Sequence, residues 1–154
     1  MLRKLALLTV LLAAAANVQA RPATRTPEAE ISEVAIAMNF LTALGSLDFD
    51  AAAPLLDENA VLDLPYVNDG LIVRGREDIL QFFQRSMSTS VSGITYKLVQ
   101  AYPSPSAGAL VLEISTQGRT KTGREYTNRL VGIFVIRGGK ITMFREYFNS
   151  AKVG

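Results

Sequence analysis

Residues 94–149 alternate apolar and polar side chains in four stretches, and this pattern restricts the fold more than any other feature of the chain. Because successive side chains of a strand point to opposite faces of a sheet, a period of two predicts four long strands. Their connections are short, so each strand is expected to pair with the next in an antiparallel meander. The predicted strands are residues 94–102, 109–117, 124–137 and 140–149.

Residues 28–87 carry a helical period instead, interrupted by two short strands. Apolar residues recur at helical spacing over residues 28–44, and Gly45 is expected to end this helix as a C′ glycine. A second, short helix follows, capped by Asp48 or Asp50. The remaining predicted elements are strands at residues 60–64 and 71–74 and a third helix at residues 76–87.

This order of elements predicts the α+β class, with one domain over residues 28–153. We expect a cone-shaped, curved antiparallel sheet wrapped around three helices. A sheet that curls around helices leaves a cavity, and such a cavity is the default ligand site.

The N-terminus has the pattern of a secretory signal peptide. Arg3 and Lys4 precede an apolar run, and small residues lead up to Ala20, so residues 1–20 are predicted to be a leader. Residues 21–27 read as a disordered spacer. The protein is therefore expected to be secreted or periplasmic, with no membrane anchor after the leader is removed.

Charge and residue usage exclude several classes of function. The chain has 16 Lys and Arg against 14 Asp and Glu; because two of the basic residues lie in the leader, the mature protein has 14 of each, and nucleic-acid binding is not expected. The chain also lacks cysteine and histidine, which excludes thiolate and imidazole metal sites and Ser-His-Asp triads. No metal or cofactor is expected, and any chemistry has to use carboxylates, Tyr, Lys, Arg or backbone amides.

The last predicted strand contains the best candidate for such chemistry. Alternation places Glu146 on one face between Phe144 and Phe148, whereas Ile141 and Tyr147 fall on the other face. Glu146 is then either a structural glutamate held by hydrogen bonds or an ion pair, or an acid/base group in an apolar pocket with a raised pKa.

Three segments carry a resemblance to a known family. Residues 56–63 (LDENAVLD), 73–79 (VRGREDI) and 139–149 (GKITMFREYFN) resemble SnoaL-like members of the nuclear-transport-factor-2-like superfamily. The resemblance implies a cone-shaped α+β barrel. The superfamily includes isomerases, cyclases, epoxide hydrolases, dehydratases and non-catalytic binding modules, so it implies a fold and a cavity but no single reaction.

Residues 122–149 resemble the limonene-epoxide hydrolases most closely. Their catalytic set is an Asp-Arg-Asp group with a Tyr and an Asn that hold the attacking water. Glu146 matches one of these acids, whereas Glu113 and Ser115 stand in place of the Arg and the other Asp. Leu62 and Leu64 stand near the positions of the Tyr and the Asn. The resemblance therefore implies one carboxylate without the rest of the set.

The catalytic groups of two other branches of the superfamily are also missing from this chain. The steroid isomerases use an Asp directly before a Pro, but here Leu64 precedes Pro65. Asp63 is one residue earlier, and its side chain is therefore expected on the opposite face of the strand. The SnoaL-type cyclases use a His-Asp pair, and this chain has no histidine.

Alternation and the resemblance together predict the cavity wall and an outer face. Glu146 is the expected catalytic residue, and the expected ligand-binding residues are Tyr66, Glu113, Ser115, Tyr126, Asn128, Phe144 and Phe148. The outer face is expected to join two copies of the chain through Arg129, Met143 and Tyr147. Two hypotheses follow: an exported isomerase-, cyclase- or hydrolase-type enzyme acting on a small apolar molecule, or a non-catalytic ligand-binding or dimeric interaction module.

Overall fold

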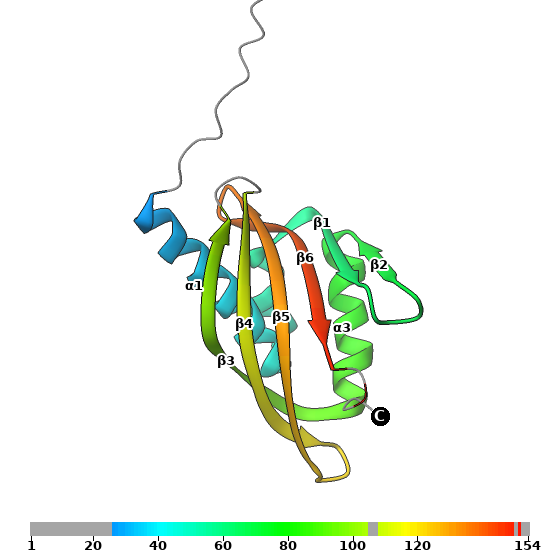
Figure 1. Cartoon of the computed structure of the whole chain (residues 1–154). Helices are drawn as coiled ribbons and strands as arrows, with labels where there is room; N and C mark the ends of the chain where they lie inside the picture. The colour runs from blue at the N-terminus through cyan, green and yellow to red at the C-terminus, as the bar shows by residue number, and fades with distance from the viewer. Residues whose placement is uncertain (1–25, 105–107, 150, 152–154) are drawn as a thin grey trace, which may run out of the picture.

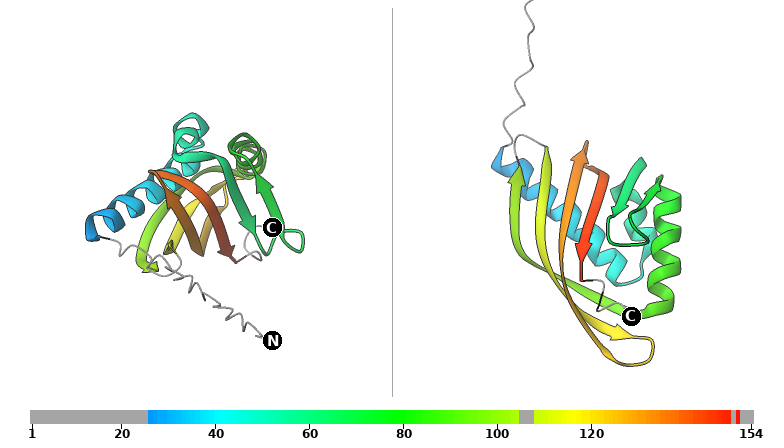
Figure 2. Two further views of the ribbon diagram at one scale, coloured as in Figure 1. Left: turned by 90° about the horizontal axis from the view of Figure 1, so that it is seen from above. Right: turned by 45° about the vertical axis from the view of Figure 1, so that its right-hand side comes forward.

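The computed structural model of the protein describes residues 26–104, 108–149 and 151. The expected leader, and most of the expected spacer, lie outside these residues. Helices cover one face of a curved sheet (Figures 1 and 2), which confirms the α+β class. The elements are α1 (Pro27–Gly45), α2 (Phe49–Ala52), the 3-10 turn η1 (Ala53–Leu55), β1 (Leu56–Leu64), β2 (Leu71–Arg74), α3 (Arg76–Ser90), β3 (Val91–Ser104), β4 (Ala109–Thr120), β5 (Glu125–Arg137) and β6 (Lys140–Phe148).

The sheet has six strands in the order β2-β1-β6-β5-β4-β3. Strands β3 to β6 form the predicted antiparallel meander. Strand β1, however, pairs with β6 in parallel, so the sheet is mixed rather than wholly antiparallel. A parallel pair needs a long connection, and here α3 and the first three strands of the meander supply it. The sheet is open, with β2 and β3 as its edges.

Local sequence explains the ends of the first two helices. The Thr26 side chain caps α1, and the Asp48 carboxylate caps α2 by accepting from the Ala51 N–H at 3.0 Å. Helix α2 ends after one turn because Pro54 lies in the next turn, which tightens to the 3-10 form. No helix among the described residues is long and apolar enough to cross a membrane.

Gly45 is the last residue of α1, but glycine is needed there for a different reason from the one expected. It does not have a positive φ; Leu47, two residues later, has φ 58°. At Gly45 the helix lies against the backbone of β3, and an added Cβ would collide with the carbonyl oxygen of Ile94 and crowd the ring of Tyr96. Glycine at this position therefore allows close helix–sheet packing.

Four phenylalanines form the centre of the core. The Phe40 ring meets the rings of Phe83 and Phe144 edge-on, with centroids 6.3 and 6.0 Å apart, and Phe144 stacks on Phe134 at 4.4 Å. Phe144 is 2% exposed, so it is a core residue and not part of an open cavity wall. This corrects the expectation that Phe144 contacts a ligand.

A β-bulge changes the predicted alternation of β6. The pairing with β5 shifts between Val135 and Ile136, and the Thr142 hydroxyl donates to the Val135 carbonyl at 3.1 Å. As a result Ile141 is fully buried on the same side as Phe144, although it was predicted on the other face.

Candidate functional site

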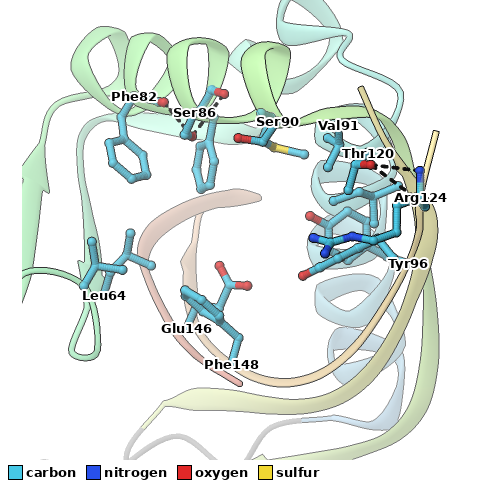
Figure 3. Close-up of a pocket in the computed structure, with 15 residues that line it drawn as sticks. Leu64, Phe82, Ser86, Ser90, Val91, Tyr96, Thr120, Arg124, Glu146 and Phe148 are labelled. Atoms are coloured by element: carbon cyan, nitrogen blue, oxygen red, sulfur yellow. Dashed lines mark hydrogen bonds between the residues drawn. The ribbon is translucent and has the colours of Figure 1, made fainter. Parts of the chain in front are cut away.

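An apolar cavity of about 360 Å³ lies beside the phenylalanine core. Helix α3 forms one wall, and Glu146 and Phe148 of β6 lie across from it (Figure 3). Strand β3 and the β4–β5 hairpin close a third side. The lining residues are Leu64, Val67, Phe82, Phe83, Ser86, Met87, Ser90, Val91, Ile94, Tyr96, Thr120, Arg124, Tyr126, Glu146 and Phe148.

Glu146 is the one acid among these lining residues. Within the described part of the chain its carboxylate accepts no hydrogen bond and forms no ion pair. Burial against the apolar wall raises the pKa of Glu146 to about 7. A carboxyl group with this pKa exists in both forms near neutral pH, so it can either donate or accept a proton.

Two tyrosines line the same cavity. Burial raises the pKa of Tyr96 above its ordinary value, and the charges of Glu146 and Tyr126 add to this effect. The Tyr96 hydroxyl is therefore a neutral hydrogen-bond donor at any physiological pH.

A buried amide orients the second tyrosine. The Nδ2 of Asn128 donates to the Tyr126 hydroxyl oxygen and to the Asn149 carbonyl, both at 3.1 Å, while its Oδ1 accepts from the Arg129 N–H at 2.8 Å. Because the Tyr126 oxygen already accepts a hydrogen bond, its own proton is left to donate to another group. Asn128 is only 5% exposed and does not line the cavity, so the expectation that it contacts a ligand is corrected; it holds the lining residue Tyr126 instead.

Arg124 is the one cation among the lining residues. It follows the turn of the β4–β5 hairpin, and Figure 3 shows its side chain directed into the cavity beside Tyr96. The sequence prediction missed both residues, although alternation could have found them. Arg124 is two residues from Tyr126 and shares its face, and Tyr96 is two residues from Ile94.

Tyr126, Phe148 and Glu146 are thus brought together at the cavity, as expected, whereas Glu113 and Ser115 are not. In β4 every second residue from Leu110 to Thr116 is buried, so Glu113 and Ser115 point to the outer face. There the Tyr102 hydroxyl donates to Glu113 at 3.4 Å, and the Ser115 hydroxyl donates to the Lys97 carbonyl at 3.5 Å. The expectation that these two residues face the cavity is wrong.

Tyr66 also lies away from the cavity. It is 62% exposed, and its ring meets the Tyr147 ring edge-on with centroids 5.6 Å apart. Asp63 pairs with Arg145 across the parallel β1–β6 register, with 2.7 Å between Oδ2 and Nε. Since Asp63 points away from Leu64, which lines the cavity, it is not placed as a base for a bound molecule.

The described residues contain no group of three or more His, Cys, Asp or Glu side chains that could hold a metal ion. The cavity instead offers one carboxyl group, two tyrosine hydroxyls and one guanidinium in an apolar wall. This set can hold a small, largely apolar molecule and exchange a single proton with it.

Comparison with known proteins agrees with the fold. Residues 37–144 match the model of the SnoaL-like domain family. A similar solved structure is a nuclear-transport-factor-2-like protein from Anabaena variabilis, with 24% identity, a TM-score of 0.70, and coverage of 84% of this chain and 97% of that one.

Two structures from Mycobacterium tuberculosis are also similar. One is an epoxide hydrolase like the limonene-epoxide hydrolases, with 22% identity, a TM-score of 0.63, and coverage of 80% and 86% of the two chains. The other was solved in complex with estradiol-17β-hemisuccinate, with 18% identity, a TM-score of 0.66, and coverage of 79% and 96%. These likenesses show the fold, and the family match spans well over half of the sequence. The chain belongs to the SnoaL-like domain family.

Proposed function

We propose that the protein binds a small apolar molecule in its cavity and that Glu146 transfers a proton to or from it. The observation that carries this proposal is a single carboxyl group, with a pKa of about 7, in the wall of a cavity of about 360 Å³. A group whose pKa is close to the working pH is an efficient general acid or base.

The reaction class that fits best is an isomerase-type proton transfer. One carboxyl group can remove a proton from a bound molecule and return it elsewhere, while Tyr96 and Tyr126 donate hydrogen bonds to the charge that develops. Hydrolysis of an epoxide by the Asp-Arg-Asp set is disfavoured, because Glu113 and Ser115 lie on the outer face. The Mycobacterium tuberculosis neighbour that holds a steroid derivative supports a ligand with an extended apolar part.

The second candidate is a protein that binds such a molecule without changing it. The observation that favours it is that Glu146 stands alone, with no second acid in the lining. Incubating apolar ketones with the protein in D2O separates the two candidates. Deuterium uptake that disappears in Glu146→Gln supports catalysis, whereas no uptake with retained binding favours the second candidate.

Ligand binding itself can be tested with the neutral dye N-phenyl-1-naphthylamine, which fluoresces in apolar surroundings. We expect saturable binding to the wild-type protein and a loss of at least about tenfold in affinity for Ser86→Trp, because an indole there fills space needed by the dye. Ile31→Trp adds the same ring at an exposed position on α1 and serves as the control. Equal affinities for the two variants would place the dye outside the cavity.

The protein is further proposed to work outside the cytoplasm. The support is the succession of Arg3-Lys4, an apolar run and small residues ending at Ala20.

Two copies of the chain are proposed to pair through the outer face of the sheet. Tyr147, Val131 and Arg129 line a shallow depression there. We expect Tyr147→Glu to weaken the dimer at least about tenfold, since it buries a charge at the contact. Ile31→Glu, at an exposed site on α1, is the matched control. Sedimentation at micromolar concentration measures both, and a wild-type monomer would rule out the pairing.

A further inference from the structure

Few charged side chains face the cavity, and the cation and the acid come from different parts of the chain. Of the lining residues, Arg124 in the β4–β5 connection is the cation and Glu146 of β6 the acid; Tyr96 of β3 and Tyr126 of β5 are the other titratable groups. Helix α3 and residues 64–67 contribute no titratable side chain to the lining. Around neutral pH, where Glu146 is partly protonated, the lining therefore carries at most one negative charge.

Hydrogen bonds to Thr120 hold the backbone of Arg124 in place. The Thr120 N–H donates to the Arg124 carbonyl at 2.9 Å, and the Arg124 N–H donates to the Thr120 hydroxyl at 3.1 Å. The same hairpin is tied to the end of α3, because the Lys121 N–H donates to the Ser90 carbonyl at 3.1 Å. The base of the Arg124 side chain is thus fixed relative to both walls, which lowers the entropy lost when a ligand binds.

The wall that faces this arginine is apolar. Phe82, Phe83 and Met87 come from α3, and Leu64 lies at the far side from Arg124 (Figure 3). A molecule that fills the cavity therefore meets a cation at one end and mainly hydrocarbon along α3, with the Glu146 carboxyl and two tyrosine hydroxyls also in the lining. A guanidinium binds a carboxylate or a similar oxyanion through two parallel hydrogen bonds, and apolar surroundings strengthen them.

We propose that the ligand is an amphipathic anion, with an apolar ring system or chain against α3 and one acidic group on the Arg124 guanidinium. This inference rests on the proposed function, since it names the class of molecule that the same cavity takes. It assigns Arg124 a role in ligand selection, which is separate from the proton transfer assigned to Glu146.

A matched pair of dyes tests the role of Arg124. 8-Anilinonaphthalene-1-sulfonate is N-phenyl-1-naphthylamine with one added sulfonate, so the two differ in the acidic group alone. We expect Arg124→Gln to weaken binding of the sulfonate by roughly tenfold to a hundredfold, the range for a hydrogen-bonded charge, and to leave the neutral dye almost unaffected. Arg85→Gln removes the same charge from an exposed position of α3 that does not line the cavity, and it should change neither affinity.

The outcomes separate this inference from the proposed function. If both dyes bind but Arg124→Gln weakens them equally or not at all, the anionic-ligand proposal is overturned and the apolar cavity stands. If neither dye binds the wild-type protein, both proposals fail. Should Arg124→Gln not fold, Arg124→Lys keeps the charge and loses the paired hydrogen bonds; an unchanged preference for the sulfonate would then contradict guanidinium recognition.

The sulfonate should also bind with a pH dependence that the neutral dye lacks. An ionised Glu146 repels an anion in the same cavity, so affinity should fall as the pH rises through about 7. Glu146→Gln should abolish this fall. A fall that persists in Glu146→Gln would mean that the anion does not share the cavity with Glu146, which contradicts the proposal.

Discussion

Replacing Glu146 with glutamine should stabilise the protein at about pH 8 by up to about 3 kcal/mol and change its stability little at about pH 4. Burial raises the pKa of Glu146 from 4.5 in the unfolded chain to about 7 in the folded protein. Between these values the folded state binds more protons than the unfolded state, so wild-type stability falls as the pH rises. Above about 7 both states are ionised, and the full cost of the buried charge remains. Glutamine has the same shape and never ionises.

Urea unfolding across this pH range measures the effect. Glu113→Gln makes the same chemical change on the outer face and should show no comparable gain at high pH. If the free energy of unfolding depends on pH in the same way for the wild type and Glu146→Gln, the acid is solvated or paired. The proposal of general acid/base catalysis by Glu146 would then have to be abandoned. If the acid acts catalytically, the stabilised variant should also lose all proton transfer.

Gly45→Ala should destabilise the protein by about 2 kcal/mol or more, although alanine is the better helix former. The added methyl group would overlap the Ile94 carbonyl oxygen, so α1 and β3 would have to separate. The Tyr96 ring, which the same methyl group crowds, lines the cavity, and we expect dye affinity to fall together with stability.

Thermal and urea unfolding report the loss, with Ser46→Ala as the control because this neighbouring residue is exposed. An unchanged unfolding midpoint in Gly45→Ala would show that the helix and the strand have room to move apart without cost.

Alternation predicted the strands of the meander and the inner faces of β5 and much of β6, because side chains in a half-buried strand sort by polarity. The alternation in β4 also indicated the correct outer face for two residues that the family resemblance placed in the cavity. Leu110, Leu112 and Ile114 mark the buried face of β4, which leaves Glu113 and Ser115 outside. Their expected place in the cavity came from matching positions in a family whose catalytic residues this chain lacks.

Other features could not be predicted from local patterns. The bulge at Thr142 depends on the pairing of β6 with β5, and the parallel β1–β6 pair joins segments about eighty residues apart in the sequence, as Asp63 and Arg145 show. The cavity itself depends on how α3 lies over the sheet, so Ser86 and Phe82 have no sequence signal that distinguishes a cavity wall from a core.

The place of β6 in the sheet has a consequence for how the chain acquires its structure. This strand lies between β1 and β5, so residues near the C-terminus join the earliest strand to the meander. Until residues 140–148 have left the ribosome, β1 and β2 have no partner in the rest of the sheet, and the wall that holds Glu146 does not exist. Contacts this distant in sequence form slowly. The six-stranded sheet can therefore be completed only when synthesis of the chain is almost finished.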